Sequence, residues 1–210
     1  MPPRPLVIHD ITRPVFAGMP VWPGDAPCRL TWTGALAEGG ANVSALSCSV
    51  HTGTHADGPY HALDDGARIG DVPLDAFIGS VHVVEAGGVA EIGAAWLDAH
   101  LPTNCERVLL RTGAWTRPDT FPARWPALTA DAARLLVDRG VRLLGTDAPS
   151  PDPSDSDDMT VHRILLGAGV AIVENVMLDG IEPGEYGLIA LPLRLAEADG
   201  SPIRAVLVER

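Results

Sequence analysis

Cysteine is scarce in this sequence, and the few cysteines follow no recognisable spacing. Only three occur, Cys28, Cys48 and Cys105, and none of them belongs to a CxxC pair. An odd and sparse set fits a reducing compartment better than a disulfide framework. The N-terminal segment also lacks the apolar core of a signal peptide, and no hydrophobic run is long enough to cross a membrane. We therefore expect a cytoplasmic protein without a membrane partner.

Basic side chains are also few. Fifteen basic residues stand against twenty-seven acidic ones, which gives a formal net charge of −12. A surface of this sign repels phosphate backbones, so nucleic acid is not an expected partner. Most of these carboxylates are expected to lie on a solvated surface that keeps the protein in solution. The acidic excess alone does not demonstrate bound cations.

Internal repeats, heptads and linkers are absent as well, and we expect one domain over residues 1–210. Hydrophobic residues account for 46% of the chain, which at this length suffices to bury a core. Thr129 is a suitable N-cap for a helix that Gly140 would end. Helices are predicted at residues 91–101, 130–139 and 160–169.

Strands outnumber these helices. Residues 42–50 alternate polar and apolar side chains, which is typical of a half-buried strand. Further strands are predicted at residues 5–8, 79–86, 107–113, 141–145 and 170–176. The chain closes with a predicted hairpin of residues 188–195 and 203–209, across a turn that contains Asp199 and Gly200. Because the helices fall between strands, we expect an α/β fold, a single mixed domain with a substantial antiparallel sheet.

The acidic segment at residues 146–158, TDAPSPDPSDSDD, must be a loop because it contains three prolines. It follows the buried strand predicted at residues 141–145. Loops at the C-terminal end of such strands are where α/β proteins tend to place function.

Residues 51–61, HTGTHADGPYH, hold three histidines and one aspartate. A fully extended chain would place His51 and His61 roughly 33 Å apart, and Gly53, Gly58 and Pro59 oppose a continuous helix. We expect a strand end that breaks into a tight loop, in which glycine lets the backbone fold around a cation. Imidazole and carboxylate without thiolate suit zinc or manganese in an open, catalytic site.

A histidine-rich polar turn without metal is the alternative interpretation of this stretch. An isolated HxxxH pair such as His51 and His55 is weak evidence for metal, and the nearby Asp57 and His61 strengthen it. From the residues alone, His61 could be a further ligand, an acid–base group at the edge of the metal, or a side chain packed beside Pro59.

Two distant residues extend this candidate site. His162 starts the helix after the acidic loop, and Glu174 lies in the apolar strand at residues 170–176. A buried, unpaired carboxylate is costly. Glu174 could face solvent near the end of its strand or pair with an arginine, but a cation would satisfy it better. Three histidines and two carboxylates suffice for a bridged pair of metals, which lowers the pKa of a shared water and binds the oxygen of an attacked carbonyl. This combination indicates a hydrolase.

The stretch at residues 51–61 resembles the HxGTHxDxPxH signature of the metal-dependent cyclase-type hydrolases, a family that includes bacterial kynurenine formamidases. The resemblance covers nearly the whole chain and implies a swivelling β/β/α, cyclase-like fold and a homodimer. Other segments resemble the formamidase branch in order and spacing: PVWPGD at residues 20–25, LLRTGAW at 109–115, LGTDAPSPDPSDS at 144–156 and ALPLRLAEADGSPIRAVL at 190–207.

Carried over residue by residue, the resemblance implies a site for two divalent metals, zinc or manganese. His51, His55 and Asp57 would bind one metal. Asp57 would bridge to the second metal, which His162 also binds, and Glu174 would bridge both.

The resemblance also implies roles around the metals. His61 would transfer protons, and Trp22 would line the substrate pocket against an aromatic ring. The alternative for Trp22 is a core anchor for the proline-rich loop. Asp147 and Ser150 match the loop pattern and would at most support the site from behind.

The implied reaction is hydrolysis of N-formyl-L-kynurenine to L-kynurenine and formate, in tryptophan degradation, by a water molecule that the metal pair activates. His61 would first help deprotonate this water and then protonate the anilide nitrogen. One alternative is a hydrolase of a cyclic amide such as isatin on the same scaffold, because the pocket around Trp22, and not the metal ligands, selects the substrate. A non-catalytic metal-binding or ligand-sensing module is the alternative from another class. A metal set together with a spare histidine argues against it.

Overall fold

One mixed sheet runs through the computed structural model, which describes residues 6–209. Its strands are ordered β1-β13-β11-β5-β7-β9-β10-β4-β12. The central four, β5, β7, β9 and β10, are parallel, and the flanking strands pair antiparallel. The strands are β1 (Ile8–Asp10), β4 (His55–Asp57), β5 (Ile78–Glu85), β7 (Arg107–Arg111), β9 (Leu143–Thr146), β10 (Ala171–Glu174), β11 (Gly184–Ile189), β12 (Gly200–Pro202) and β13 (Val206–Val208). The predicted mixed α/β fold with a substantial antiparallel component is confirmed. Pro5, in the first predicted strand, lies outside the described residues.

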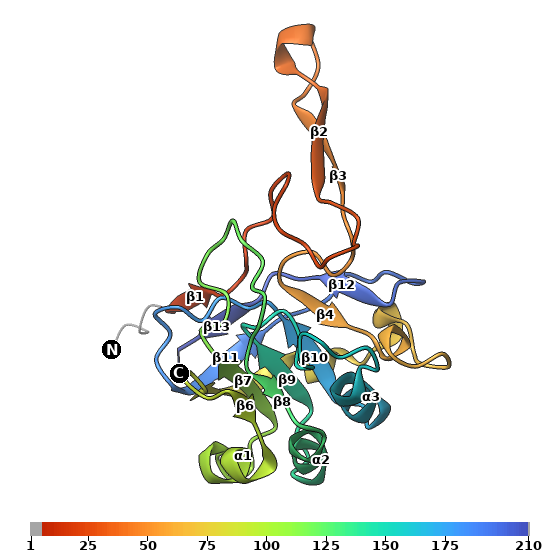
Figure 1. Cartoon of the computed structure of the whole chain (residues 1–210). Coiled ribbons are helices and arrows are strands. Elements are labelled where there is room, and N and C mark those ends of the chain that lie inside the picture. Colours follow the sequence, from red (N-terminus) through yellow and green to blue (C-terminus); the bar gives the residue numbers. More distant parts are fainter. Residues whose placement is uncertain (1–5, 210) are drawn as a thin grey trace.

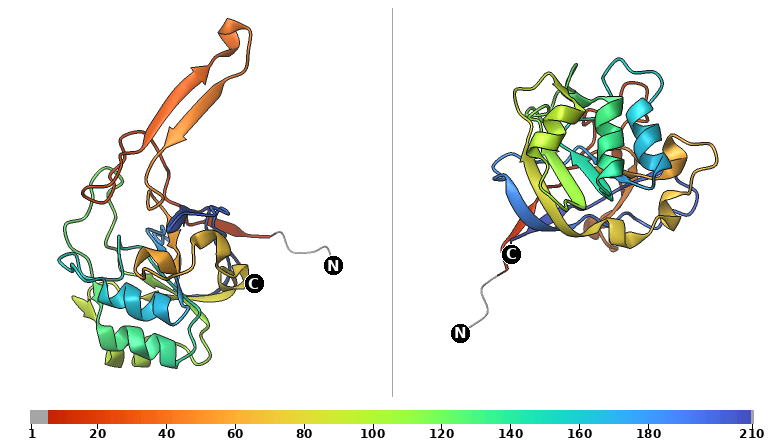
Figure 2. Two further views of the ribbon diagram at one scale, coloured as in Figure 1. Left: turned by 90° about the vertical axis from the view of Figure 1, so that its right-hand side faces the viewer. Right: turned by 90° about the horizontal axis from the view of Figure 1, so that it is seen from below.

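Three helices cover one face of this sheet (Figures 1 and 2). They are α1 (Ala94–His100), α2 (Ala130–Asp138) and α3 (Thr160–Gly167). The Thr129 side chain accepts a hydrogen bond from the backbone N–H of Ala132, as predicted for an N-cap. None of the helices found in residues 6–209 is long and apolar enough to cross a membrane.

The first predicted helix was too long at its N-terminal end. Glu91–Ile92 form the short strand β6, which pairs parallel with β8 (Ala127–Leu128), and the extended backbone of Gly93 separates this strand from α1. The described residues also contain four single-turn 3₁₀ helices: η1 (Leu36–Glu38), η2 (Pro59–His61), η3 (Ile69–Asp71) and η4 (Leu74–Ala76).

Alternation along the central strands creates two apolar cores. Val108, Leu110 and Ile172 face the helices and pack in a cluster with Leu136 and Leu165. Their neighbours Leu109, Leu143 and Val173 face the other way, into a second cluster that strands β4, β11 and β13 also line. Burial on both faces explains the continuous apolar sequence of these strands.

Strands β2 (Arg29–Gly34) and β3 (Val43–Ser47) form a separate hairpin that projects from the body on the side opposite the helices (Figures 1 and 2). The strand predicted at residues 42–50 therefore exists, but it is exposed along its whole length. Its period-2 pattern is nevertheless real, because Leu30 and Leu46 pair directly and share one face of the hairpin with Trp32.

The predicted C-terminal hairpin needs a larger correction. Strands β11 and β13 do pair antiparallel, with Ile189 opposite Val206. The chain between them does not form a tight turn, since Gly200–Pro202 leaves to form β12 along β4. This excursion carries Asp199 to the candidate site.

Candidate metal centre and its cavity

The register between β4 and β10 brings the first functional side chains together. His55 lies directly opposite Glu174, and Asp57 lies opposite Ile172. Ala56, between the two β4 residues, points into the apolar core behind the sheet. His55 and Asp57 therefore point to the same face as Glu174, and His55 Nε2 lies 3.2 Å from Glu174 Oε2. We expected a strand that ends in a tight loop within residues 51–61. In the structure the loop comes first, and strand β4 follows it.

Two more histidines reach this group from the loop before β4 and from α3. His51 Nδ1 lies 3.0 Å from Asp57 Oδ1. His162, in the first turn of α3, places Nε2 3.1 Å from Glu174 Oε1 and 3.5 Å from Asp57 Oδ2. Gly53, at φ +69, allows the tight turn, and its carbonyl accepts a hydrogen bond from His55 Nδ1. The structure thus brings together all five predicted ligands.

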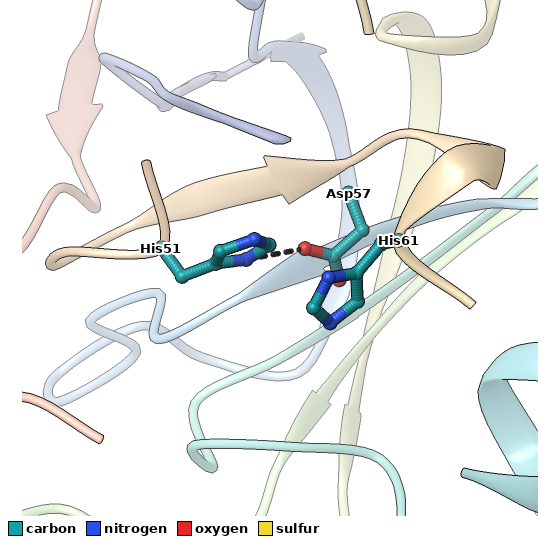
Figure 3. A group of neighbouring side chains, drawn as sticks. All are labelled: His51, Asp57 and His61. Atoms are coloured by element: carbon teal, nitrogen blue, oxygen red, sulfur yellow. Dashed lines mark ion pairs between the residues drawn. The ribbon is translucent and has the colours of Figure 1, made fainter. Parts of the chain in front are cut away.

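His61 lies beside this group, on the 3₁₀ turn η2 (Figure 3). Its ring centroid is 4.2 Å from that of His51 and 5.5 Å from that of His162. Two sets of three residues could each hold an ion, because the potential ligand atoms within each set lie within 4.8 Å of one another. The sets are His51, Asp57 and His61, and His55, Asp57 and Glu174. Asp57 belongs to both sets, as expected of a residue that could bridge two ions.

The buried atoms of the group fit a cation. Both carboxylate oxygens of Asp57 and Nε2 of His55 are buried and make no hydrogen bond among the described residues, and their close contacts are ion pairs such as that between His51 and Asp57. Buried polar atoms are rarely left without partners. Glu174 is also buried and contacts histidines, so neither solvent nor an arginine satisfies it. Imidazole nitrogens and carboxylate oxygens are suitable ligands for zinc or manganese.

The histidines and carboxylates of the centre shift one another's pKa values. Burial lowers the pKa of His51, but its contacts with Asp199 and Asp57 outweigh this effect and raise the pKa to about 9. Burial likewise lowers the pKa of His55, and Asp57 and Glu174 raise it to about 10. Burial opposes ionisation of Asp57, yet the close histidines hold the pKa of its carboxyl well below its usual range. Without metal, protons on the histidines balance the buried carboxylates.

A cavity of about 850 Å³ opens over this centre. His51, His55, His61, His162 and Glu174 line its floor. Trp22 lies on its wall with Phe121 and Trp125, and each of these ring centroids is 5.8 Å from that of Trp22. Trp22 is 41% exposed, so it is not a core anchor. The cavity therefore combines an ionisable floor with an aromatic wall, an arrangement that suits a flat ring bearing a polar group.

Similarity to known proteins agrees with this geometry. The model of the family Cyclase, described as "Putative cyclase", matches residues 9–153. The chain belongs to the Cyclase family.

Curated relatives match this Cyclase-family chain over almost its whole length. The kynurenine formamidase of Paracidovorax citrulli is 44% identical over 210 aligned residues, covering 97% of each chain. The kynurenine formamidase of Bacillus cereus is 40% identical over 199 residues, covering 94% of this chain and 95% of the relative.

Solved structures of similar proteins share the Cyclase-family fold. A predicted metal-dependent hydrolase from Bacillus stearothermophilus superimposes with a TM-score of 0.85 at 29% identity, covering 98% of this chain and 99% of its own. Isatin hydrolase A from Labrenzia aggregata superimposes with a TM-score of 0.82 at 25% identity, covering 97% of this chain and 94% of its own.

Two aspartates that contact the candidate centre were not predicted from the sequence. Asp152 Oδ2 lies 2.6 Å from His162 Nδ1, and Asp152 Oδ1 accepts a hydrogen bond from the backbone N–H of Val161. Asp199 Oδ2 lies 2.9 Å from His51 Nε2. Asp152 could have been predicted as a partner of His162, because it lies in the acidic loop ten residues before that histidine. No local signal singled out Asp199, because its sequence context is that of an ordinary turn.

The two residues expected to support the site differ from each other. Ser150 lines the cavity, and its hydroxyl accepts a hydrogen bond from the backbone N–H of Asp152. Asp147 instead accepts hydrogen bonds from the backbone N–H groups of Thr112 and Gly113, so it joins two loops. Burial raises the pKa of the Asp147 carboxyl, and these hydrogen bonds oppose the rise.

Proposed function

We propose that the protein is a metal-dependent formamidase that hydrolyses N-formyl-L-kynurenine to L-kynurenine and formate. The observation that carries this proposal is identity of 40% and 44% to kynurenine formamidases over nearly the whole chain. The acidic, histidine-rich floor and the aromatic wall of the cavity support it chemically, because the substrate joins a formamide to an aromatic ring.

The proposed metal ligands are His51, His55, Asp57, His162 and Glu174, which would hold two divalent cations, zinc or manganese. The unpartnered oxygens of Asp57 and its membership of both ligand sets support a bridging role. Divalent cations bound there would lower the pKa of a water molecule and polarise the formyl carbonyl. Asp152 would orient His162 through its Nδ1, leaving Nε2 for the cation.

His61 is proposed to move the proton. Its ring lies against those of His51 and His162 and lines the cavity in which a substrate would bind. An anilide nitrogen leaves well only once it is protonated, so His61 would accept a proton from water and return it to that nitrogen. If His61 is instead a metal ligand, its removal will lower the metal content, whereas removal of a proton carrier will not.

Trp22 is proposed to bind the aromatic ring of the substrate. Its side chain contacts the two aromatic neighbours edge-on and remains partly exposed where it lines the cavity, so part of its surface is accessible to a ligand. Aromatic pairs of this kind are worth about 0.5–1.5 kcal/mol beyond their burial.

Isatin hydrolysis is the second candidate, because an isatin hydrolase shares the fold at a TM-score of 0.82. Purified protein should be assayed on N-formyl-L-kynurenine and on isatin under identical metal conditions. The proposal predicts a kcat/KM at least about 100-fold higher for formylkynurenine, a difference of ~2.7 kcal/mol in transition-state binding. A preference for isatin would overturn it.

We further propose a cytoplasmic homodimer. Three free cysteines suit a reducing compartment. The hairpin exposes Leu30, Trp32 and Leu46 on one face, and a two-stranded hairpin is at best marginally stable by itself. A second copy of the chain would cover this apolar face.

A further inference from the structure

Asp199 contacts two histidines of the floor through a single oxygen. Its Oδ2 lies 2.9 Å from Nε2 of His51 and 3.1 Å from Nδ1 of His61. His51 belongs to the proposed ligand set, and His61 is the proposed proton carrier. The Asp199 side chain is thus the element that both groups share.

The backbone around Asp199 holds this carboxylate in place. Its carbonyl accepts a hydrogen bond of 2.7 Å from the N–H of Gly58, and the preceding carbonyl, of Ala198, accepts one from Ile69. The following residues form β12 along β4, with Gly200 opposite Asp57. The backbone that carries this carboxylate is therefore held next to β4, the strand that carries Asp57.

Gly200 permits the close approach of His51. A Cβ atom at this position would lie 2.8 Å from Cε1 of His51 and 3.1 Å from the carbonyl oxygen of Ala56. Only a glycine after Asp199 lets the His51 ring lie against β12, where its Nε2 reaches the carboxylate.

The orientation of both rings follows from these contacts. With Nε2 of His51 directed at Asp199, its Nδ1 faces Asp57. With Nδ1 of His61 directed at Asp199, its Nε2 is the nitrogen left for proton exchange, and no hydrogen bond among the described residues engages it. A carboxylate in this position fixes the tautomer and the ring angle of a histidine.

We infer that Asp199 is a positioning residue that orients His51 toward the metal centre and His61 toward the substrate. The inference for His61 rests on the proposed formamidase function, whereas the inference for His51 needs only metal binding. One carboxylate would then couple the strength of metal binding to the efficiency of proton transfer.

The test compares Asp199→Asn with Glu197→Gln, which removes one negative charge from an exposed side chain two residues away. Zinc affinity is measured by competition with a chromogenic chelator, and kcat and KM for N-formyl-L-kynurenine are measured at saturating zinc. We expect Asp199→Asn to weaken zinc binding about 10- to 100-fold. It should also lower kcat about 10- to 100-fold with KM nearly unchanged. Glu197→Gln should match wild type in both measurements.

A double variant separates positioning from a general structural role. If Asp199 acts on turnover through His61, adding Asp199→Asn to His61→Ala will lower kcat by less than about twofold at saturating zinc. Independent, multiplicative losses would overturn the inference, as would wild-type zinc affinity and kcat in Asp199→Asn. Asp199→Glu, which keeps the carboxylate, should recover part of the lost zinc affinity; no recovery would contradict a role for the charge.

These outcomes are separable from the formamidase proposal. A wild-type protein that binds zinc but does not hydrolyse formylkynurenine would refute that proposal, while the zinc-affinity comparison would still test the contact between Asp199 and His51. An active wild type with an unaffected Asp199→Asn variant would refute only the positioning role.

Discussion

The candidate metal centre buries ionisable side chains, whereas the hairpin of β2 and β3 exposes apolar ones. In the centre, Asp57 and His55 are almost completely buried and retain polar atoms without hydrogen-bond partners among the described residues. In the hairpin, Trp32 is 66% exposed and Leu46 is 57% exposed. Each region reverses the usual distribution of polar and apolar groups.

The two reversals indicate different partners. Unpartnered buried oxygens and nitrogens are satisfied by a cation, because a cation restores the electrostatic stabilisation that burial removes. An exposed apolar face is satisfied by another apolar surface, with no requirement for exact atomic geometry. The metal centre therefore depends on exact atomic positions, whereas the apolar face of the hairpin does not. Single substitutions should accordingly reduce metal binding more than they reduce apolar association.

Asp57→Asn should have the largest effect, since Asp57 is shared by both ligand sets. Loss of its charge leaves the three surrounding histidines without their common carboxylate, so we expect loss of bound metal and a decrease in kcat of roughly 10³-fold or more. Metal content and turnover are measured on the same purified samples, with Asp155→Asn in the exposed acidic loop as the matched control. Full metal content and activity in Asp57→Asn would refute the bridging role.

Trp32→Ser should weaken self-association without touching the metal centre. A large exposed aromatic residue is a typical energetic anchor of an interface, so its loss should raise the dimer dissociation constant about 10- to 100-fold, or ~1.4–2.7 kcal/mol. Analytical ultracentrifugation across a concentration series measures this change. Thr31→Ser, on the opposite face of the same strand, is the control. A wild-type chain that is monomeric at micromolar concentration would contradict the proposed dimer.

Gly200→Ala should damage the centre by crowding. Its new Cβ would meet His51 and the backbone of β4, and we expect a loss of about 1–3 kcal/mol in the free energy of unfolding. Gly167→Ala makes only an ordinary contact, at 3.9 Å from Leu63, and should leave stability unchanged or slightly raised. Chemical denaturation of both variants distinguishes crowding from a generic glycine effect; equal stabilities would exclude it.

The pH dependence should differ between metal-free and metal-bound protein. The pKa of His51 is raised to about 9 and that of His55 to about 10 in the folded, metal-free chain. Their stabilising contribution is complete below the unfolded pKa of about 6.5 and is lost as the pH rises through 9 and 10.

Metal must displace these protons, so the gain in Tm on adding zinc should increase between pH 6 and pH 9. Thermal unfolding with chelator or with zinc at each pH measures both trends. A gain that shrinks as the pH rises would contradict the assigned protonation.

Local pattern was sufficient to predict part of this molecule. The Thr129 cap and the Gly140 stop predicted α2, and the density of histidine and aspartate in residues 51–61 predicted the candidate metal centre. His162 and Glu174 stood out because one follows an acidic loop and the other interrupts an apolar strand. The structure brings these two residues to the histidine stretch through the pairing of β10 with β4 and the packing of α3.

The predictions that were wrong depended on contacts between segments far apart in the sequence. The alternation in residues 42–50 correctly predicted a strand, but the half-burial it also predicted is wrong, because β3 is exposed along its whole length. The turn at Asp199 and Gly200 was misplaced because β12 pairs with β4, more than 140 residues earlier in the sequence. Asp199 could be recognised only once this pairing had brought it to His51.

The most direct test of the central claim measures metal content and formylkynurenine hydrolysis together, before and after treatment with a chelator. We predict two divalent ions per chain, loss of activity as they are removed, and recovery of activity when zinc or manganese is restored. Full hydrolytic activity in chain that has been shown to contain no metal would contradict the account.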